Sequence, residues 1–352
     1  MTTIHIGVIG CGSIATHRHL PEYAQHPNVN IAAVTDPVFT RAKERAEKYN
    51  ATAYKTTEEL LAADLDAVSI CTPNVAHAPL SIQALSSGKH VLCEKPMAAT
   101  TSEALEMIEA EKASGKTLMI AHNQRFVPSH QEAKKLIANG TIGEVYSVRT
   151  TFGHGGPEGW SIDGADSWFF DQTRAIVGAL GDLGIHKADV IRYILDEDID
   201  EIAAFTTNLS KPHGNVEDNA QCVLKTENGK LVSLIASWSY HASEENSTII
   251  FGEKGTIRCE DDPTYSLIIE YANGNRSLHE LGEIQTNDAQ TNSGVIDAFI
   301  DTIQYGSIPP VTGYDGKKSL EIILAAQTAA ETKRTIKISD VSSKAIQGGH
   351  QR

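Results

Sequence analysis

One lysine in the chain follows an apolar run and could act on a reacting hydroxyl group. Lys95 stands in the sequence Glu94-Lys95-Pro96, directly after residues that predict a strand. A lysine ammonium could stabilise the negative charge that develops on an alkoxide oxygen, and Glu94 could balance its charge. Pro96 makes the turn rigid. The same triplet, read alone, is also typical of an ordinary polar turn.

A carboxylate and an imidazole stand four residues apart in the second half of the chain. Asp182 and His186 would therefore project from one face of a helix. A histidine ordinarily titrates near neutral pH, so this pair could serve as a base with its orienting carboxylate. Two other interpretations stay open: part of a zinc site, or a capping Asp beside a core His. Because no third ligand stands nearby, we expect no metal.

A glycine-rich turn near the start of the chain has the spacing of a dinucleotide-binding fingerprint. Gly10, Gly12 and Ala15 follow the first expected strand. Gly10 permits the tight turn, and Gly12 lets the backbone approach a pyrophosphate. Ser13 and Ile14 begin a helix whose N-terminus attracts negative charge. A glycine-rich turn without a ligand is the alternative.

An acidic residue at the end of the next expected strand indicates which dinucleotide would bind. The Asp36 carboxylate could accept hydrogen bonds from the ribose hydroxyls of NAD and would repel the 2′-phosphate of NADP. We therefore expect NAD. Arg41 and Lys43 stand close by, so NADP remains the less favoured alternative.

Three polar residues follow a further expected strand and could contact the ribose of the cofactor. Thr72, Asn74 and His77 come directly after the run Ala67–Cys71. Ligands of open α/β sheets bind beyond the carboxyl ends of the strands. We expect these three residues, with Glu94, to contribute to the cofactor site, although His77 could simply begin a helix.

Aromatic and acidic residues alternate in a later segment that suits a polyhydroxylated ligand. Trp160 and Trp168 are interleaved with Asp163 and Asp166, and rings can pack on sugar CH faces while carboxylates bind hydroxyls. His154 is a further candidate substrate contact. Ordinary core packing explains the aromatic residues equally well.

The first 123 residues alternate between strand-like and helical patterns. Apolar, β-rich runs predict strands at Ile4–Ile9, Ile31–Thr35, Ala67–Cys71, His90–Cys93 and Leu118–Ala121. Helices are expected at Thr40–Tyr49, His77–Ser87 and Thr101–Ser114, the last with a capping box of Thr100 and Glu103. This alternation predicts an α/β domain, a doubly wound parallel sheet with helices on both faces.

Residues 124–338 follow a different pattern, in which long β-type runs from Ile202 onward succeed one another without intervening helices. We expect strands at Glu144–Phe152, Ile202–Leu209, Ala220–Lys225, Leu231–Trp238, Thr248–Phe251, Thr256–Cys259 and Tyr265–Tyr271. Asn228-Gly229 and Asn273-Gly274 indicate hairpins. Helices at His130–Asn139, Asp182–Leu195, Gly294–Tyr305 and Lys318–Thr332 would cover one face. The prediction is an α+β domain with a large, mostly antiparallel open sheet, followed by a polar tail at 339–352.

Composition excludes several classes of function. The chain has 352 residues, and its 30 Lys and Arg against 45 Asp and Glu leave a net charge of −15. This surplus disfavours nucleic acid and anionic membrane surfaces as partners. The five cysteines are widely spaced and odd in number, which predicts buried reduced thiols. No signal-peptide pattern or long apolar stretch is present, so we expect a cytoplasmic protein.

In combination, these motifs resemble the Gfo/Idh/MocA oxidoreductases, named for glucose–fructose oxidoreductase and inositol dehydrogenase. The fingerprint, the Thr72–His77 segment, Glu94-Lys95-Pro96 and the Asp-x-Gly-x-His-x-x-Asp element at 182–189 match in order and spacing, as does the later 252–256 segment. One departure concerns the stretch before Asp182, where members often show three glycines. Here Ile176, Val177 and Gly178 stand instead.

The resemblance implies a Rossmann domain, a second domain whose open sheet often builds homodimers or homotetramers, and NAD(P)-dependent chemistry on sugars or cyclitols such as inositol. By match, Lys95 is the catalytic lysine, and Asp182 and His186 complete the site. We expect these three to bind substrate together with His154, Trp160 and Trp168, which the residue pattern suggests. Two alternatives remain: a non-catalytic NAD(P)-binding regulator, and a sugar–sugar oxidoreductase that retains its cofactor. Since Lys95, Asp182 and His186 are all present, we favour an enzyme.

Overall fold

The computed structural model describes residues 3–282 and 292–341 and divides the chain into two compact units. The first unit comprises 1–122, 160–168 and 285–317, and the second comprises 123–159, 169–284 and 318–352. The first continuous segment ends at residue 122, one residue before the boundary that the sequence suggests. The sequence division assigns 160–168 and 292–317 to the second domain, whereas both pack with the first unit. The expected polar tail lies almost wholly outside the described residues.

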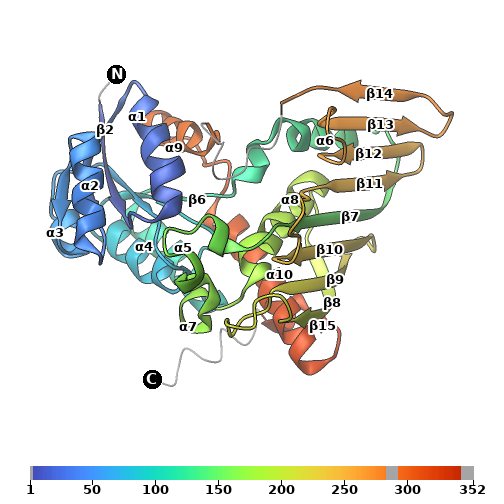
Figure 1. Cartoon of the computed structure of the whole chain (residues 1–352). Coiled ribbons are helices and arrows are strands. Elements are labelled where there is room, and N and C mark those ends of the chain that lie inside the picture. The colour runs from blue at the N-terminus through green and yellow to red at the C-terminus, as the bar shows by residue number, and fades with distance from the viewer. Residues whose placement is uncertain (1–2, 283–291, 342–352) are drawn as a thin grey trace. The chain divides into compact units, whose positions relative to one another are not determined.

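The first unit is built on a six-stranded sheet in the order β3-β2-β1-β4-β5-β6, in which all neighbours are parallel (Figure 1). This order reverses direction between β1 and β4, which is where dinucleotide folds bind their ligand. The strands are β1 (Ile4–Ile9), β2 (Val29–Thr35), β3 (Thr52–Tyr54), β4 (Ala67–Ile70), β5 (His90–Cys93) and β6 (Leu118–Ile120). The predicted parallel sheet is confirmed, and β3 is an addition.

Helices connect these strands, and two of them, α3 and α5, begin at capping boxes. They are η1 (Ala15–His19), α1 (Leu20–Gln25), α2 (Phe39–Tyr49), α3 (Thr57–Leu61), η2 (Asn74–Ala76), α4 (His77–Ser86) and α5 (Thr101–Ser114). The predicted capping box is present, because the Glu103 amide donates to Thr100 Oγ1 at 3.2 Å and the Thr100 amide donates to Glu103 Oε2 at 3.1 Å. A second capping box joins Thr56 and Glu59.

Two later segments complete the first unit. Residues 160–168 include η5 (Gly164–Asp166), and residues 285–317 include α9 (Val295–Tyr305). The start of α10 (Gly313–Thr332) packs on this sheet, since a Cβ at Gly316 would lie 2.8 Å from Ile120. Ser293 anchors α9 beside α1 by donating its hydroxyl to Glu22 at 2.8 Å.

The second unit contains a nine-stranded sheet in the order β14-β13-β12-β11-β7-β10-β9-β8-β15. All neighbours are antiparallel except β7 and β10, so the mostly antiparallel sheet is confirmed. Both Asn-Gly pairs form the expected hairpin turns, with Gly229 at φ 85° and Gly274 at φ 87°. The strands are β7 (Val145–Gly153), β8 (Ile199–Thr207), β9 (Asn219–Thr226), β10 (Leu231–Ser237), β11 (Thr248–Gly252), β12 (Gly255–Cys259), β13 (Leu267–Tyr271), β14 (Arg276–His279) and β15 (Ile336–Lys337).

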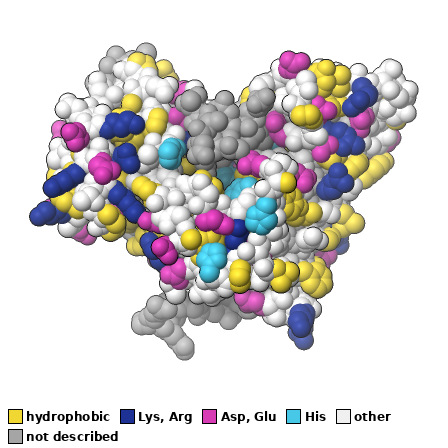
Figure 2. Space-filling model, in the orientation of Figure 1, with side chains coloured by type: hydrophobic (Ala, Val, Ile, Leu, Met, Phe, Trp, Pro, Cys, Tyr) yellow, Lys and Arg dark blue, Asp and Glu magenta, His cyan; other side chains and the backbone are white. Residues whose placement is uncertain are grey.

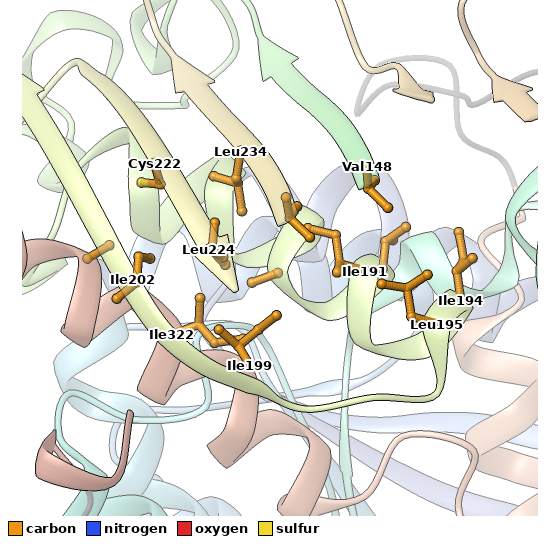
Figure 3. Close-up of a cluster of buried hydrophobic side chains, with 14 of the residues drawn as sticks. Val148, Ile191, Ile194, Leu195, Ile199, Ile202, Cys222, Leu224, Leu234 and Ile322 are labelled. Atoms are coloured by element: carbon orange, nitrogen blue, oxygen red, sulfur yellow. The ribbon is translucent and has the colours of Figure 1, made fainter. Parts of the chain in front are cut away.

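Helices cover one face of this sheet and form the main core with it. The elements are η3 (Asn123–Phe126), α6 (Pro128–Ala138), η4 (Pro157–Gly159), η6 (Trp168–Phe170), which starts in the first unit, α7 (Gln172–Ala175), η7 (Leu180–Gly184), α8 (Ile185–Leu195) and the rest of α10. Figure 3 shows side chains of α8, α10 and the strands pointing toward one another, among them Ile191, Ile322 and Leu234. Burial of such aliphatic side chains contributes about 1.5–3 kcal/mol each and fixes the position of α8.

The opposite face of the nine-stranded sheet carries exposed hydrophobic side chains. Phe205 on β8 is 80% exposed, and the same face carries Val223 on β9, Leu231 on β10 and, beyond β7, Phe251 on β11. Figure 2 shows hydrophobic side chains between charged ones along the strands of this unit. No helix of the described chain covers this face.

Two further expectations concern cysteines and membrane spans. All five cysteines are free and buried, as predicted. Among the helices of the described residues, none combines the length and the apolar character that crossing a membrane requires.

Candidate active site

The first unit presents the glycine-rich turn as a cradle at the end of β1. Gly10 has φ 93°, and a Cβ there would lie 2.5 Å from the Cys71 carbonyl oxygen, so no side chain fits. A Cβ at Gly12 would meet nothing within 4 Å, which leaves the backbone open to a ligand. The helix then begins, with the Thr16 amide donating to the Gly12 carbonyl. These features fit a bound pyrophosphate.

Asp36 and Thr72 border the same switch point. The buried Asp36 carboxylate accepts hydrogen bonds from the Cys11 and Val38 amides, both at 2.7 Å, so the turn after β1 and the turn after β2 hold it in place. Its remaining lone pairs suit ribose hydroxyls. The Thr72 hydroxyl is buried and has no hydrogen-bond partner among the described residues. An unsatisfied buried hydroxyl at a strand end fits a bound ligand.

His77 occupies a different role from a direct ligand. Its Nδ1 lies 2.7 Å from the Pro96 carbonyl oxygen, and its Nε2 lies 2.8 Å from the Thr72 carbonyl oxygen. Burial lowers the pKa of the ring. The imidazole therefore joins the loop after β4 to the loop after β5. Asn74 is buried in η2, in the loop after β4.

Glu94 anchors the loop that carries Lys95 to the helix after the glycine-rich turn. Its Oε1 lies 2.9 Å from His19 Nε2, and its Oε2 accepts the Lys95 amide at 3.1 Å. Burial alone would raise the pKa of Glu94, but the His19 hydrogen bond and the charges of His19, Lys95 and Arg18 lower it to about 2. Lys95 itself is half-buried, directly after β5. The carboxylate thus fixes the backbone from which the Lys95 side chain extends.

The second unit brings Asp182, His186 and His154 together. Asp182 lies in η7, a π-helical turn that runs straight into α8, which carries His186. Such turns are frequent at functional sites. Asp182 Oδ2 accepts the Trp238 indole N–H at 3.1 Å and lies 3.8 Å from His154 Nε2. The Phe152 ring neighbours both histidines, with its centroid 5.8 Å from that of His186 and 5.9 Å from that of His154.

Charged groups fix the ends of this helical run. Glu217 accepts the amides of Gly178 and Leu180, both at 2.9 Å. Arg125 forks onto Asp189 with two bonds of 2.7 Å, which explains the final Asp of the 182–189 element. Sequence reasoning gave no role to Glu217, Trp238 or this ion pair, because each partner lies far away in the chain.

The remaining predicted residues lie in the first unit. Trp160 and Trp168 bound the 160–168 segment, and the Trp160 carbonyl accepts the Ser13 hydroxyl at 3.1 Å. Asp182, His186 and His154 therefore form one cluster, whereas Lys95 and the two tryptophans are placed with the glycine-rich turn. Within residues 3–282 and 292–341, no group of three or more His, Cys, Asp or Glu side chains could hold a metal ion.

Comparisons with known proteins match both halves of the chain. Residues 4–122 match the oxidoreductase family with an NAD-binding Rossmann fold, and residues 130–258 match the GFO/IDH/MocA C-terminal domain. Myo-inositol 2-dehydrogenase of Thermotoga maritima is 29% identical over 96% of this chain and 99% of its own. D-glucoside 3-dehydrogenase of Escherichia coli is 26% identical over 95% and 97%.

A solved structure agrees over the same length. Aldose-aldose oxidoreductase from Caulobacter crescentus superposes with a TM-score of 0.82 at 29% identity, covering 95% of this chain and 99% of that one. Matches to both domain models and full-length similarity to relatives of this kind confirm the expected family. The chain belongs to the GFO/IDH/MocA family of NAD-binding oxidoreductases.

Proposed function

We propose that the protein is an NAD-dependent dehydrogenase that oxidises a secondary alcohol of a neutral sugar or cyclitol, with Lys95, Asp182 and His186 as its catalytic group. The observation that carries this proposal is the cluster of Asp182, on a π-helical turn, with His186 of α8 and His154 after β7, in a chain that also holds a dinucleotide cradle. The full-length relatives named as dehydrogenases of an inositol and a glucoside support it.

The reaction removes a hydride from carbon and a proton from oxygen. NAD, when bound, supplies the acceptor for the hydride. The His186 imidazole accepts the hydroxyl proton, and the Lys95 ammonium stabilises the oxygen as negative charge develops. Asp182, held by the Trp238 indole, binds a neighbouring hydroxyl or orients an imidazole. His154 is a further substrate contact, and the rings of Trp160 and Trp168 pack against the CH faces of the sugar.

The charges of the site favour a neutral substrate. The chain carries a net charge of −15, and the guanidinium of Arg125 is engaged by the Asp189 carboxylate. A phosphorylated sugar would need a cationic partner for its dianion. Cyclitols, sugars and anhydrosugars need only hydroxyl-binding groups such as Asp182 and His154.

We also propose that the protein is a homo-oligomer. The exposed face of the nine-stranded sheet bears Phe205, Val223, Leu231 and Phe251, which water would otherwise solvate. Pairing of two such faces would bury this apolar area.

A dehydrogenase screen tests the proposed function. NADH absorbance is followed with neutral sugars, inositols and anhydrosugars, with both NAD and NADP. On the best substrate, Lys95→Ala should lower turnover at least about a hundredfold and leave NADH binding nearly intact. Lys112→Ala, on the exposed face of α5, is the matched control. Near-normal turnover of Lys95→Ala would contradict the assignment, and NAD binding without any turnover would favour a regulatory protein.

A further inference from the structure

A short segment of the first unit lies on the glycine-rich turn and is bonded to it. We call residues 160–168 the strap. The Ser13 hydroxyl donates to the Trp160 carbonyl at 3.1 Å and accepts the Ile162 amide at 2.8 Å. The Ser161 hydroxyl donates to Ser167 at 2.8 Å, which closes the strap on itself. The Ser13 hydroxyl is therefore bonded to the strap backbone twice, once as a donor and once as an acceptor.

The strap also carries a carboxylate to a basic helix. Asp163 forms an ion pair with Arg41, with Nη2 against Oδ1 and Nη1 3.5 Å from Oδ2. The two side chains are 33% and 24% exposed. Arg41 lies in the first turn of α2, where its amide donates to the Val38 carbonyl at 2.8 Å. Lys and Arg side chains gather on this side of the first unit (Figure 2).

Arg41 belongs to the electrostatic surroundings of Asp36. Burial and the Asp36 charge raise the pKa of the Cys11 thiol to about 12, while the charges of Arg45 and Arg41 oppose this rise. The Cys11 amide donates to the Asp36 carboxylate at 2.7 Å. Val38 donates its amide to Asp36 Oδ1 at 2.7 Å and accepts the Arg41 amide at its carbonyl. The start of α2, which carries Arg41, therefore adjoins the carboxylate where an adenosine ribose would bind.

In dinucleotide folds, an arginine at this place accommodates the 2′-phosphate of NADP. Arg41 has the position and the charge for that contact. Its guanidinium instead meets Asp163, whose charge neutralises it and would repel a phosphate dianion.

We infer that Asp163 is a specificity-determining residue, which occupies Arg41 and so makes the site select NAD over NADP together with Asp36. This inference rests on the proposed function, because it assumes that the cradle binds a nicotinamide dinucleotide. It assigns to the strap a role that the acidic and aromatic pattern alone did not indicate.

Direct binding of NADH and NADPH to the full chain tests the inference without any sugar. Dissociation constants are measured by fluorescence titration for the wild type, Asp163→Asn and Asp166→Asn. Asp166 lies on the same strap, is exposed and forms no ion pair with the described residues, so its variant removes the same charge without touching Arg41. A fourth protein combines Asp163→Asn with Arg41→Ala.

Asp163→Asn should tighten NADPH binding about tenfold relative to NADH, because it releases a guanidinium for charge-assisted bonds to phosphate. Asp166→Asn should leave this ratio unchanged, and Arg41→Ala should cancel the gain. The inference is wrong if the ratio of the NADPH and NADH dissociation constants in Asp163→Asn stays within about twofold of the wild-type ratio. It is also wrong if Asp166→Asn changes this ratio as much as Asp163→Asn does. A wild type that binds neither dinucleotide would instead overturn the proposed function, and the inference with it.

Discussion

Lys187 makes the stability of the second unit depend on pH in a direction that can be measured. Its side chain is fully buried on α8, and its Nζ donates to the Asn246 carbonyl at 2.9 Å and lies 3.4 Å from Thr248 Oγ1. Burial lowers the pKa of the amine from 10.5 to about 7, although the charges of Cys259, Glu260, Glu244 and Glu245 oppose this shift. His130 faces it as well, with a pKa lowered to about 3.

The folded and unfolded states differ in the protonation of Lys187, and this difference sets the direction in which stability changes with pH. Between pH 7 and pH 10.5 the unfolded chain keeps Lys187 protonated, whereas the folded chain has lost the proton. The unfolded state then binds more protons, so the free energy of unfolding rises with pH. The difference of 10.5 − 7 = 3.5 pKa units corresponds to an upper limit of about 5 kcal/mol, which the folded protein bears in full below pH 7.

Replacement by methionine removes the titrating group and keeps most of the side-chain volume. Lys187→Met leaves the Asn246 carbonyl without its donor, a pH-independent loss of about 1–3 kcal/mol. Against this variant, the wild type should gain about 1.4 kcal/mol per pH unit, or about 2 kcal/mol between about pH 7.5 and pH 9. Between about pH 7.5 and pH 9 the thiols titrate only in the unfolded chain, equally for both proteins, and so cancel in the difference.

Urea unfolding at the two pH values measures the effect, followed by circular dichroism and by tryptophan fluorescence. Lys135→Met is the control, since Lys135 is 70% exposed in the same unit and its loss removes one positive charge. The control should track the wild type at both pH values. If the difference between wild type and Lys187→Met stays constant within about 0.5 kcal/mol, the amine does not titrate as its burial implies and the reasoning fails.

Three further changes test other parts of the structure. Glu94→Gln should lower the free energy of unfolding by up to about 3 kcal/mol near neutral pH. This difference should shrink as the pH falls from 4.5 to about 2, where the wild-type carboxylate takes up its proton. Urea midpoints measured across this acid range that differ by a constant amount would contradict the prediction. Trp238→Phe removes the donor to Asp182 and should lower kcat with NADH affinity unchanged, whereas an unchanged kcat in steady-state assays would deny the indole a positioning role. Phe205→Glu places a charge on the open sheet face and should yield smaller particles in light scattering, and an unchanged mass would exclude that face as the interface.

The parallel sheet was predictable because its strands are buried on both faces and alternate with helices. β1 and β5 have the expected bounds, and α5 begins and ends as its capping residues indicate. The strands β3 and β15 were not predicted, because three and two residues are too few to show a period. Pairing between β7 and β10 was also beyond reach, since no local pattern reports which distant strand lies alongside.

The last long helix starts earlier than the sequence pattern predicts. α10 begins at Gly313, five residues before the expected Lys318. Gly is unfavourable in a helix, so intrinsic propensity does not indicate a helix start at Gly313, with Gly316 in the first turn. In the structure a Cβ at Gly313 would lie 3.0 Å from Ile108, and one at Gly316 would lie 2.8 Å from Ile120. Close packing on the first sheet therefore explains these residues.

The residue types predicted where polar groups lie in the fold, but not which other residues they contact. His77 is at the expected strand end, yet both ring nitrogens face carbonyl oxygens of neighbouring loops. Asp163 was predicted to bind hydroxyls, and the structure pairs it with Arg41, 122 positions away in sequence. Such long-range partners decide the role of a side chain, and only the folded chain shows them.

The stretch before Asp182 shows how this chain departs from the family pattern of three glycines. Gly178 cannot change, because a Cβ there would lie 2.0 Å from the Glu217 carbonyl oxygen. Ile176 has φ 74° and ψ −54°, a conformation that costs a β-branched residue about 1–3 kcal/mol. Its side chain packs against the main core of the second unit, and this burial offsets the strain. The turn that positions Asp182 therefore keeps the glycine that its geometry requires at Gly178. At Ile176 it has a strained backbone, and the apolar contacts of the side chain compensate for that strain.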